Sequence, residues 1–429
     1  MRLSTVIVLV CLKAACAWVA PKPSSPRVMP LNMVVESPDA TRQISSPVGL
    51  TLDKLTAVLG GRGRALSCWE CFRKGVNPSW YFSSADELTP EPRIAKLHNE
   101  GWSRSRLELQ GPPLGWKTLL ALKKMASLEN DVAHLTHVST SKDGTTKLLL
   151  KLVDGLEVET VIIPWSERER STLCISSQVG CRQGCTFCAT GRMGKLRSLS
   201  RDEILAQVYW ANKVCRIDEI YPVDNIVFMG MGEPGDNTKE VVQATKTMVD
   251  HQMFGLASKR VTISTVGPNP EVFSELAEAP AVLAWSVHAT RQEIRNALVP
   301  TTKHSMEELR SGLLTALEGR SRALNSTMLE ITLLSGVNDS YEDAMALIDF
   351  CTPIKERVSK LVVNLIPWNN IGAPSGAASL FEQPSPESVA AFQKTLTENG
   401  VRCYIRTTRG DDESAACGQL ATKKKKQAA

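Results

Sequence analysis

Three cysteines give the strongest chemical signal in this chain of 429 residues. Cys181, Cys185 and Cys188 lie in the run GCRQGCTFC at 180–188, with glycines beside them. A cluster of four irons has four corners, so three thiolates can hold it and leave one iron open to bind another molecule. The spacing therefore predicts an iron–sulfur cluster at which chemistry can take place.

Two other uses of three cysteines have to be weighed. A structural zinc site needs a second pair of ligands nearby and closes all four coordination positions. No His or Cys occurs in the twenty residues after Cys188, which argues against zinc. Small buried thiols in an apolar core are the second alternative. On the cysteines alone, both alternatives stay open.

Alternating strand and helix patterns follow the cysteines. Apolar, β-branched runs predict buried parallel strands. With a first strand at 173–177, they lie at 226–229, 261–264, 282–285, 329–333 and 361–365. Between them, segments such as 202–210 and 306–317 carry apolar residues at helical spacing. The pattern predicts an α/β fold with six βα units, a partial barrel of the TIM type.

Polar or glycine-rich groups follow several predicted strands. They are Gly232-Glu233-Pro234, Ser264-Thr265, Ser286-Val287-His288 and Pro367-Trp368-Asn369. In such barrels the reactive groups lie at the carboxyl ends of the strands. Each group alone is also explained by a helix cap, a turn or a core histidine. Together, at successive strand ends, they predict a site that faces the cysteine loop.

The CxxxCxxC loop, the GEP turn and the partial barrel resemble the radical S-adenosylmethionine (radical SAM) superfamily. Two further runs, TLCISSQVGC at 172–181 and RGDDESAACGQL at 409–420, resemble the RlmN/Cfr-type RNA adenine methyltransferases. The similarity extends from about residue 50 to 421, with the motifs in the order of the family. The resemblance is to the RlmN type, in an organellar form.

The resemblance implies a cofactor site. Cys181, Cys185 and Cys188 would ligate a 4Fe-4S cluster, and the open iron would bind S-adenosylmethionine. Gly232 and Glu233 would hold the amino group of that molecule. Its other contacts would come from Ser264, Ser286, Val287, His288 and Asn369.

The resemblance also implies three catalytic residues. Cys417 would carry the methyl group as S-methylcysteine, and Cys174 would pair with it in a transient disulfide. Glu159 would accept the proton of the adenine ring. Because strand residues alternate faces, Glu157 shares the face of Glu159, and only the family motif selects between them. The alternative to a role as proton acceptor is that Glu159 is a solvent-facing carboxylate of the hairpin.

The implied reaction is methylation of carbon 2 of an adenine in large-subunit ribosomal RNA, with transfer RNA as a further candidate substrate. Methylation of carbon 8 of the same base is one alternative. A non-catalytic RNA-binding or ribosome-assembly factor is the alternative of another class. The implied partners are the RNA, an electron donor such as ferredoxin or flavodoxin, and a thiol that reduces the disulfide. We expect a monomer with no membrane attachment in its mature form.

Composition divides the chain into five parts. Residues 1–45 read as a targeting leader, with an apolar stretch too short to span a membrane followed by Ser, Pro and basic residues. The leader predicts a two-part plastid address, with mitochondrial, secretory or cytoplasmic location as alternatives. After it we expect a helical RNA-binding domain (46–135), a β-hairpin linker (136–166), the radical SAM domain (167–421) and a basic tail (422–429).

The formal net charge is only +5, so any RNA-binding surface must be local. The segment 51–128 is a candidate because it places basic residues beside aromatic ones, which can bind phosphates and stack on bases. They are Arg62, Arg64, Arg73 and Lys74, with Trp69, Phe72, Trp80 and Tyr81. The alternative is the core and rim of an ordinary helical domain. Cys68 and Cys71 form a CxxC pair in a helical segment without a second ligand pair, so zinc or redox function is not expected there. Cys215, Cys351 and Cys403, in helix or strand patterns, are expected to be core residues.

Overall fold

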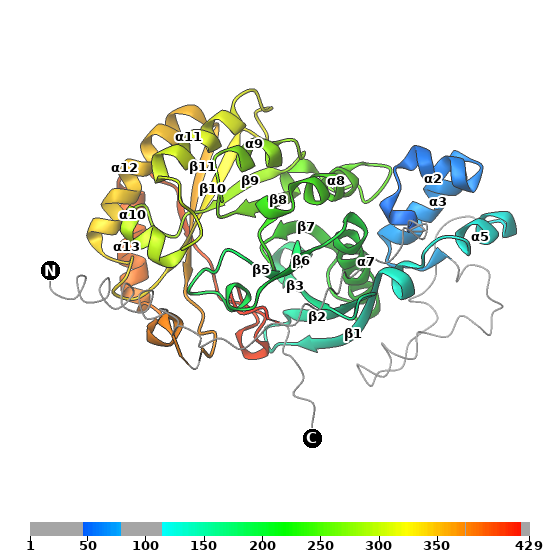
Figure 1. The fold of residues 1–429 in the computed structure, drawn as a ribbon, viewed down its shortest axis with the longest axis horizontal. Helices are drawn as coiled ribbons and strands as arrows, with labels where there is room; N and C mark the ends of the chain where they lie inside the picture. Colours follow the sequence, from blue (N-terminus) through cyan, green and yellow to red (C-terminus); the bar gives the residue numbers. More distant parts are fainter. Residues whose placement is uncertain (1–45, 79–113, 374, 422–429) are drawn as a thin grey trace, which may run out of the picture.

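A ten-stranded sheet forms the body of the computed structural model, which describes residues 46–78, 114–373 and 375–421 (Figure 1). The strand order is β1-β2-β3-β4-β7-β8-β9-β10-β11-β12. From β4 onward, all neighbouring strands are parallel. These strands are β4 (Arg170–Cys174), β7 (Val223–Phe228), β8 (Val261–Thr265), β9 (Val282–Ser286), β10 (Ser326–Leu333), β11 (Lys360–Pro367) and β12 (Cys403–Ile405).

The predicted α/β fold with a partial barrel is confirmed. Each of the six predicted strands overlaps one of the strands from β4 to β11. The first begins three residues earlier than expected, at Arg170, and ends at Cys174. A seventh parallel strand, β12, was not predicted. It is only three residues long and two of them are exposed, so it has neither the length nor the apolar pattern of a core strand.

Helices cover the outer side of the parallel strands (Figure 1). They are α7 (Arg201–Ile217), α8 (Thr238–Val249), α9 (Glu271–Ala277), α10 (Gln292–Leu298), α11 (Met306–Leu317), α12 (Tyr341–Arg357) and α13 (Pro386–Glu398). Three of them begin with a capping box, in which a serine and the acid three residues later bond to each other's backbone N–H. These serines are Ser200, Ser305 and Ser340.

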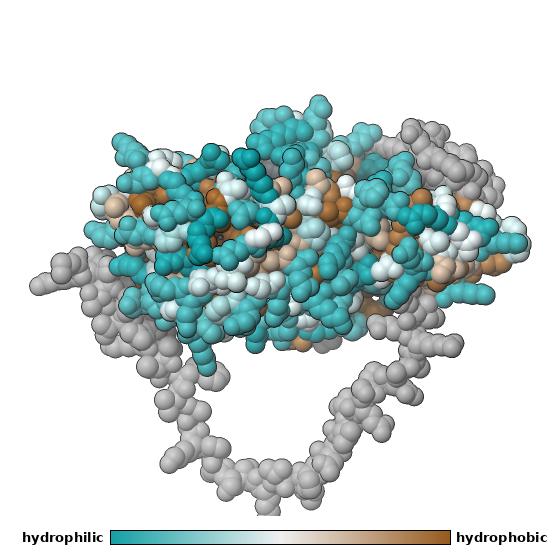
Figure 2. All heavy atoms as spheres, turned by 90° about the horizontal axis from the view of Figure 1, so that it is seen from above, coloured by the Kyte–Doolittle hydropathy of each residue, from teal (hydrophilic) through white to brown (hydrophobic). Residues whose placement is uncertain are grey.

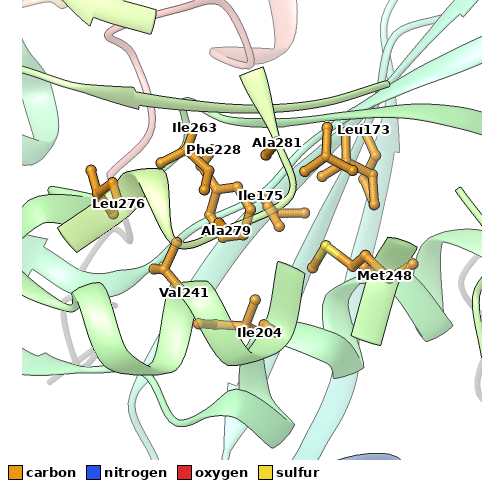
Figure 3. Packing of buried hydrophobic residues seen from close by; sticks show 14 of the residues in the cluster. Leu173, Ile175, Ile204, Phe228, Val241, Met248, Ile263, Leu276, Ala279 and Ala281 are labelled. Carbon is orange, nitrogen blue, oxygen red and sulfur yellow. The ribbon is translucent and has the colours of Figure 1, made fainter. Parts of the chain in front are cut away.

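The main core lies between the strands and these helices (Figure 3). Leu173, Phe228 and Ile263 project from neighbouring strands toward Ile204 of α7 and Val241 of α8. All five side chains are at most 2% exposed. Burying an aliphatic or aromatic side chain of this size contributes about 1.5–3 kcal/mol. This packing holds the strand ends in fixed relative positions.

The predicted hairpin differs from the structure in extent. Three antiparallel strands replace it: β1 (Ala133–Thr140), β2 (Thr146–Leu152) and β3 (Glu157–Trp165). The third strand pairs with β4, with Val161 opposite Cys174. The sheet is therefore continuous across the expected boundary at residue 167, and the segment belongs to the same sheet as the barrel strands.

Helices α2 (Leu52–Leu59), α3 (Arg62–Arg73) and α5 (Trp116–Leu122) lie at one end of the molecule (Figure 1). Trp69 and Phe72 are buried, and the ring of Trp69 meets that of Phe254 edge to face at 5.4 Å. Arg73 donates to the carbonyl of Met253 at 2.8 Å. Trp69 and Phe72 thus belong to the core, as in the alternative reading of this segment.

Several predicted features fall outside the described residues: the leader 1–45, Trp80, Tyr81 and the tail 422–429. Hydrophilic side chains dominate the face of the described chain seen in Figure 2, with apolar ones scattered among them. Within the described ranges, no helix combines the length and the hydrophobicity needed to cross a bilayer.

Replacing Leu329 by Ala tests the contribution of the core. Leu329 is fully buried on β10, between Trp285 of β9 and Val363 of β11. The lost burial and the remaining cavity should lower the free energy of unfolding by about 2–5 kcal/mol, measured by urea denaturation. Val153→Ala is the control, since that side chain is 73% exposed and should change stability by about 0.5 kcal/mol or less. Equal losses in the two variants would contradict this assignment of the core.

Candidate active site

A cavity of about 130 Å³ lies at the carboxyl ends of the parallel strands. Among the described residues, its wall brings together most of the side chains that the sequence singled out. They are Cys181, Cys185, Cys188, Gly232, Glu233, Ser264, Ser286, His288, Asn369 and Cys417. Residues from 181 to 417 thus meet at one edge of the sheet, as the strand-end argument predicts.

The three cysteines lie on a firmly anchored loop. Cys181 ends the short strand β5 (Gln178–Cys181), and Cys188 immediately precedes the helix α6 (Ala189–Arg192). Strand β5 pairs with β6 (Gly194–Ser198) so closely that a Cβ on Gly180 would lie 1.8 Å from the carbonyl oxygen of Gly194. Only glycine fits there. Arg182 and Gln183 both bond to Asp236, at 2.7 and 2.9 Å, and hold the loop against the GEP turn.

The donor set of this loop suits a cluster better than a single ion. Burial raises the pKa of all three thiols, to about 12 for Cys181, so metal binding must displace their protons. Within the described ranges, no three Cys, His, Asp or Glu side chains converge closely enough to hold one metal ion. A four-iron cluster distributes its cysteines over separate corners, whereas zinc gathers them on one ion. The zinc alternative is therefore disfavoured.

Glu233 presents a carboxylate at the cavity wall. It is 3% exposed and accepts the backbone N–H groups of Gly235 at 2.7 Å and Val266 at 2.9 Å, and the hydroxyl of Thr265. Burial raises its pKa to about 7, although these hydrogen bonds oppose the shift. Gly232, before it, has φ +98°, and a Cβ there would lie 2.5 Å from that of Gln178. The turn needs glycine at this position to hold Glu233 in place.

Ser264, Ser286 and His288 occupy adjacent strand ends. The two serine hydroxyls are 3.0 Å apart, between β8 and β9. His288 has φ +59°, and its Nδ1 accepts the backbone N–H of Thr332 at 3.2 Å. Burial holds its pKa well below the usual value, so the ring is neutral at physiological pH. These groups supply hydrogen bonds but no charge.

Val287, predicted to contact the cofactor, is not among the residues that line the cavity. Its side chain is fully buried, and its backbone carbonyl accepts Arg295 at 2.9 Å. Neighbours on a strand end point to opposite sides, and here Ser286 and His288 face the cavity while Val287 faces the core. The predicted contact of Val287 with the cofactor stays a prediction.

Cys417 lies on the loop 409–421, which closes the cavity. The amide of Asn369 donates to the carbonyl of Cys417 at 3.0 Å, and Thr408 donates to Asn369 at 2.9 Å. Asp412 bonds to Ser141 and to the backbone N–H of Lys142 in the β1–β2 turn. Asn369 therefore positions the Cys417 loop as well as lining the cavity.

Cys417 also lines a second cavity, of about 520 Å³, together with Cys174 at the end of β4. Both cysteines are free, and their thiols are close enough to interact electrostatically. Burial raises the pKa of Cys174 to about 12, and the nearby guanidinium of Arg406 lowers it in part. Desolvation of the thiol also raises the pKa of Cys417, although the residue as a whole is exposed at the surface, and Arg406 opposes that shift. The structure thus brings together the two cysteines that the sequence paired.

Arg406 is a site residue that the sequence analysis missed. It follows β12 directly and lines both cavities. Its guanidinium lies 3.5 Å from Glu330, which also accepts the amide of Asn364 at 2.8 Å. No motif marks Arg406 or Glu330, because their pairing depends on the order of β10, β11 and β12 in the sheet. A short strand with an arginine at its end was the only available signal.

Glu159 is not among the residues that line either cavity, although it bonds next to Leu420, which lines both. Its side chain is 8% exposed and lies 3.6 Å from the ammonium of Lys147, and it accepts the backbone N–H of Ala421 at 2.9 Å. The carboxylate is therefore held by the chain that follows Cys417. Its role as proton acceptor remains a prediction.

The other described cysteines are Cys68, Cys71, Cys215, Cys351 and Cys403, all buried and free. Burial raises the pKa of each thiol above its ordinary value. All five are core residues, as predicted for Cys215, Cys351 and Cys403.

Two kinds of similarity to known proteins agree with this geometry. The sequence profile of the Radical SAM superfamily matches residues 175–348, which include the cysteine loop and the GEP turn. The crystal structure of a radical SAM methyltransferase from Sphaerobacter thermophilus is 30% identical with a TM-score of 0.68, covering 88% of this chain and 100% of that one. A domain of pyruvate-formate lyase-activating enzyme from Bacteroides vulgatus is 16% identical over 43% of this chain and 99% of that one, with a TM-score of 0.33.

Replacing Cys181, Cys185 or Cys188 singly by Ala should sharply reduce iron binding after anaerobic reconstitution. Loss of a supporting residue around a metal already costs about 10–100-fold in affinity, and loss of a ligand should cost at least that much. Iron and sulfide content, with visible absorption, would measure the effect. Cys215→Ala, in α7, is the control and should bind as much iron as the wild type. Equal iron loss in that control would contradict the assignment.

Binding of S-adenosylmethionine should weaken as the pH falls through about 7, because protonated Glu233 no longer attracts an ammonium group. The affinity should approach a tenfold loss per pH unit below that pKa. Isothermal titration calorimetry of the reconstituted protein with S-adenosylmethionine, between about pH 6 and pH 8, would measure this loss of affinity. Glu233→Gln should bind more weakly with no such slope, and a parallel slope in that variant would refute the role of Glu233.

Proposed function

This chain belongs to the radical SAM superfamily, and from that premise we propose that it methylates carbon 2 of an adenine in large-subunit ribosomal RNA. The observation that supports the proposal is the position of Cys417. Its thiol lines both the cavity of the cluster cysteines and the cavity of Cys174. A group carried on that sulfur can pass between the two without leaving the protein.

The family carries a 4Fe-4S cluster and S-adenosylmethionine, and the residues of the first cavity fit both. Cys181, Cys185 and Cys188 would hold the cluster, and Glu233 would bind the amino group of S-adenosylmethionine. When bound, they supply one-electron cleavage chemistry that opens a radical route to an unreactive carbon. Phe187 and Trp368, both at most 6% exposed, help to exclude water from this cavity.

A cysteine carrier explains the need for two further thiols. Carbon 2 of adenine is too poor a nucleophile to take a methyl group by direct displacement, so Cys417 would deliver the carbon and remain bonded to the RNA. The thiolate of Cys174 would then attack the Cys417 sulfur, which forms the S–S bond and breaks the C–S bond. The released electron pair takes up a proton at the new methyl group. An external thiol returns the disulfide to two thiols.

Arg406 suits the demands of this exchange. Cys417 must be a thiolate to take up a methyl group, and Cys174 must be one to attack the Cys417 sulfur, while desolvation opposes both ionisations. The guanidinium of Arg406 favours the thiolate of both Cys174 and Cys417. Glu330, at 3.5 Å, fixes the position of that guanidinium. We assign Arg406 to positioning and stabilising the two thiolates.

The second cavity has features that suit an RNA substrate. Arg409 lies over the ring of Trp165 at 5.1 Å, and Arg168 and Arg170 lie on the same wall. Arginines bind phosphates, and an aromatic or guanidinium plane can stack on an unpaired base. A flipped or unpaired adenine can enter a pocket that a paired one cannot reach. The volume of about 520 Å³ leaves room for a nucleotide beside Cys417.

Glu159 is our candidate for the proton acceptor. The backbone N–H of Ala421 donates to one of its oxygens, so a shift of the chain after Cys417 would expose that oxygen further. The ammonium of Lys147 lies 3.6 Å from the other oxygen. A carboxylate that becomes more accessible when the carrier loop moves would act late in the cycle.

The remaining parts of the proposal come from the sequence. We propose a plastid location from the leader-like residues 1–45, and ferredoxin or flavodoxin as the electron donor. We also propose that the mature protein is a monomer, with transfer RNA as a further candidate substrate.

Mass spectrometry of nucleosides tests the proposed reaction. Ribosomal RNA treated with the reconstituted protein, S-adenosylmethionine and a reductant should contain 2-methyladenosine. Cys417→Ala should produce none, and Cys174→Ala should accumulate a covalent protein–RNA adduct, visible as a band shift that nuclease removes. Cys351→Ala, in α12, is the matched control and should keep full activity.

Three outcomes would count against this proposal. Formation of 8-methyladenosine would assign the enzyme to the carbon-8 reaction. RNA binding without methylation by a cluster-loaded protein would favour a non-catalytic factor. Full activity of the Cys417→Ala variant would exclude the cysteine carrier.

A further inference from the structure

Arg295, on α10, is a buried cation surrounded by neutral groups. It is 1% exposed. Its guanidinium donates to the carbonyls of Ser286 and Val287, each at 2.9 Å, and of Val266 at 2.5 Å. Its Nε has no hydrogen-bond partner, and it forms no ion pair with an acid in the described part of the chain. A buried charge is normally paired, so this arrangement calls for a nearby anion.

Arg295 keeps its charge at neutral pH. Burial lowers its pKa, but only to about 10. In a medium of low polarity its field reaches further than it would in water. The acidic groups that feel this field are Cys185 and Glu233. Both lie on the wall of the first cavity, whereas Arg295 lies behind that wall.

The helix that carries Arg295 also holds the cluster loop. The backbone N–H of Thr186 donates to the carbonyl of Leu298 at 3.0 Å, at the end of α10. Cys185 packs in one apolar cluster with Leu298 and Val266. Glu233 already accepts three hydrogen bonds and faces the amino group of S-adenosylmethionine in our proposal. Glu233 is thus already assigned to another cation. The anion left to balance the charge of Arg295 is therefore the cluster, held by the thiolate of Cys185.

We propose that Arg295 is the counter-cation of the iron–sulfur cluster and raises its reduction potential. Three thiolates give the cluster a net negative charge, and reduction adds one more electron to it. A fixed positive charge behind Cys185 stabilises the reduced form more than the oxidised form. The inference needs only the cluster that the family implies, and it holds whether or not the substrate is RNA.

Two substitutions separate the charge of Arg295 from its hydrogen bonds. Arg295→Gln keeps an N–H donor and removes the charge, whereas Arg295→Lys keeps the charge with fewer donors. Arg320→Gln is the matched control. Arg320 is half-buried and donates to the carbonyls of Ala279 and Ala281 at 2.8 and 2.7 Å, at the opposite, amino end of β9.

The experiment is an anaerobic redox titration of each reconstituted full-length protein without S-adenosylmethionine, followed by its visible and electron paramagnetic resonance spectra. Arg295→Gln should show at least about a tenfold lower ratio of reduced to oxidised cluster at a fixed potential, which is about 59 mV for one electron. Arg295→Lys and Arg320→Gln should stay near the wild type. Equal shifts in the Gln and Lys variants would overturn the proposal, and so would an unchanged potential in Arg295→Gln.

Thermal unfolding gives a second readout, which remains available if Arg295→Gln takes up little iron. The rise in Tm on cluster loading should be smaller in Arg295→Gln than in Arg295→Lys, because the loaded form loses an attraction. Without the cluster, Arg295→Gln should lose no more stability than Arg320→Gln. A larger loss in the cluster-free Arg295→Gln protein would identify a structural arginine and overturn the proposal.

Discussion

Parallel pairing of the strands from β4 to β12 is the constraint on which every part of the site depends. The register places Glu330 opposite Ser286 on one side and Asn364 on the other, and Cys174 opposite Val227. Groups that are far apart in the chain therefore reach the same level at one edge of the sheet. Their side chains need little further adjustment to meet around one cavity.

Because Glu233, His288 and Cys185 are buried at that edge, charge has a large effect on what these side chains can do. Glu233 has its pKa raised by burial and can take a cation, whereas Arg406 lies beside two thiols that burial would otherwise keep protonated. Arg295 donates only to backbone carbonyls and forms no ion pair with an acid in the described part of the chain. In a medium of low polarity a buried charge needs a group of opposite charge nearby. Each buried charge of the site therefore indicates the charge of the ligand that binds beside it.

The sequence predicts those features that depend on local chemistry. Runs of apolar, β-branched residues locate the parallel strands. The spacing of the three cysteines, with the glycines beside them, locates the cluster loop. The roles of Arg406 and Arg295 were out of reach, because each follows from the meeting of distant segments. The alternation of faces at 286–288 could have placed Val287 in the core. The three strands from β1 to β3 join the barrel sheet through β3 and β4, a pairing that no local pattern encodes.

The proposed carrier role requires Cys417 to move, and the structure holds it in a way that permits movement. Its loop is anchored by side-chain contacts at the rim, such as Asp412 with Ser141 and Lys147 with the carbonyl of Glu413, and not by a strand ladder. Contacts of this kind open locally at much lower cost than a sheet unfolds. Cys174, fixed at the end of β4, cannot move in the same way. The thiol of Cys417 is thus suited to move between the two cavities, whereas the thiol of Cys174 keeps a fixed position.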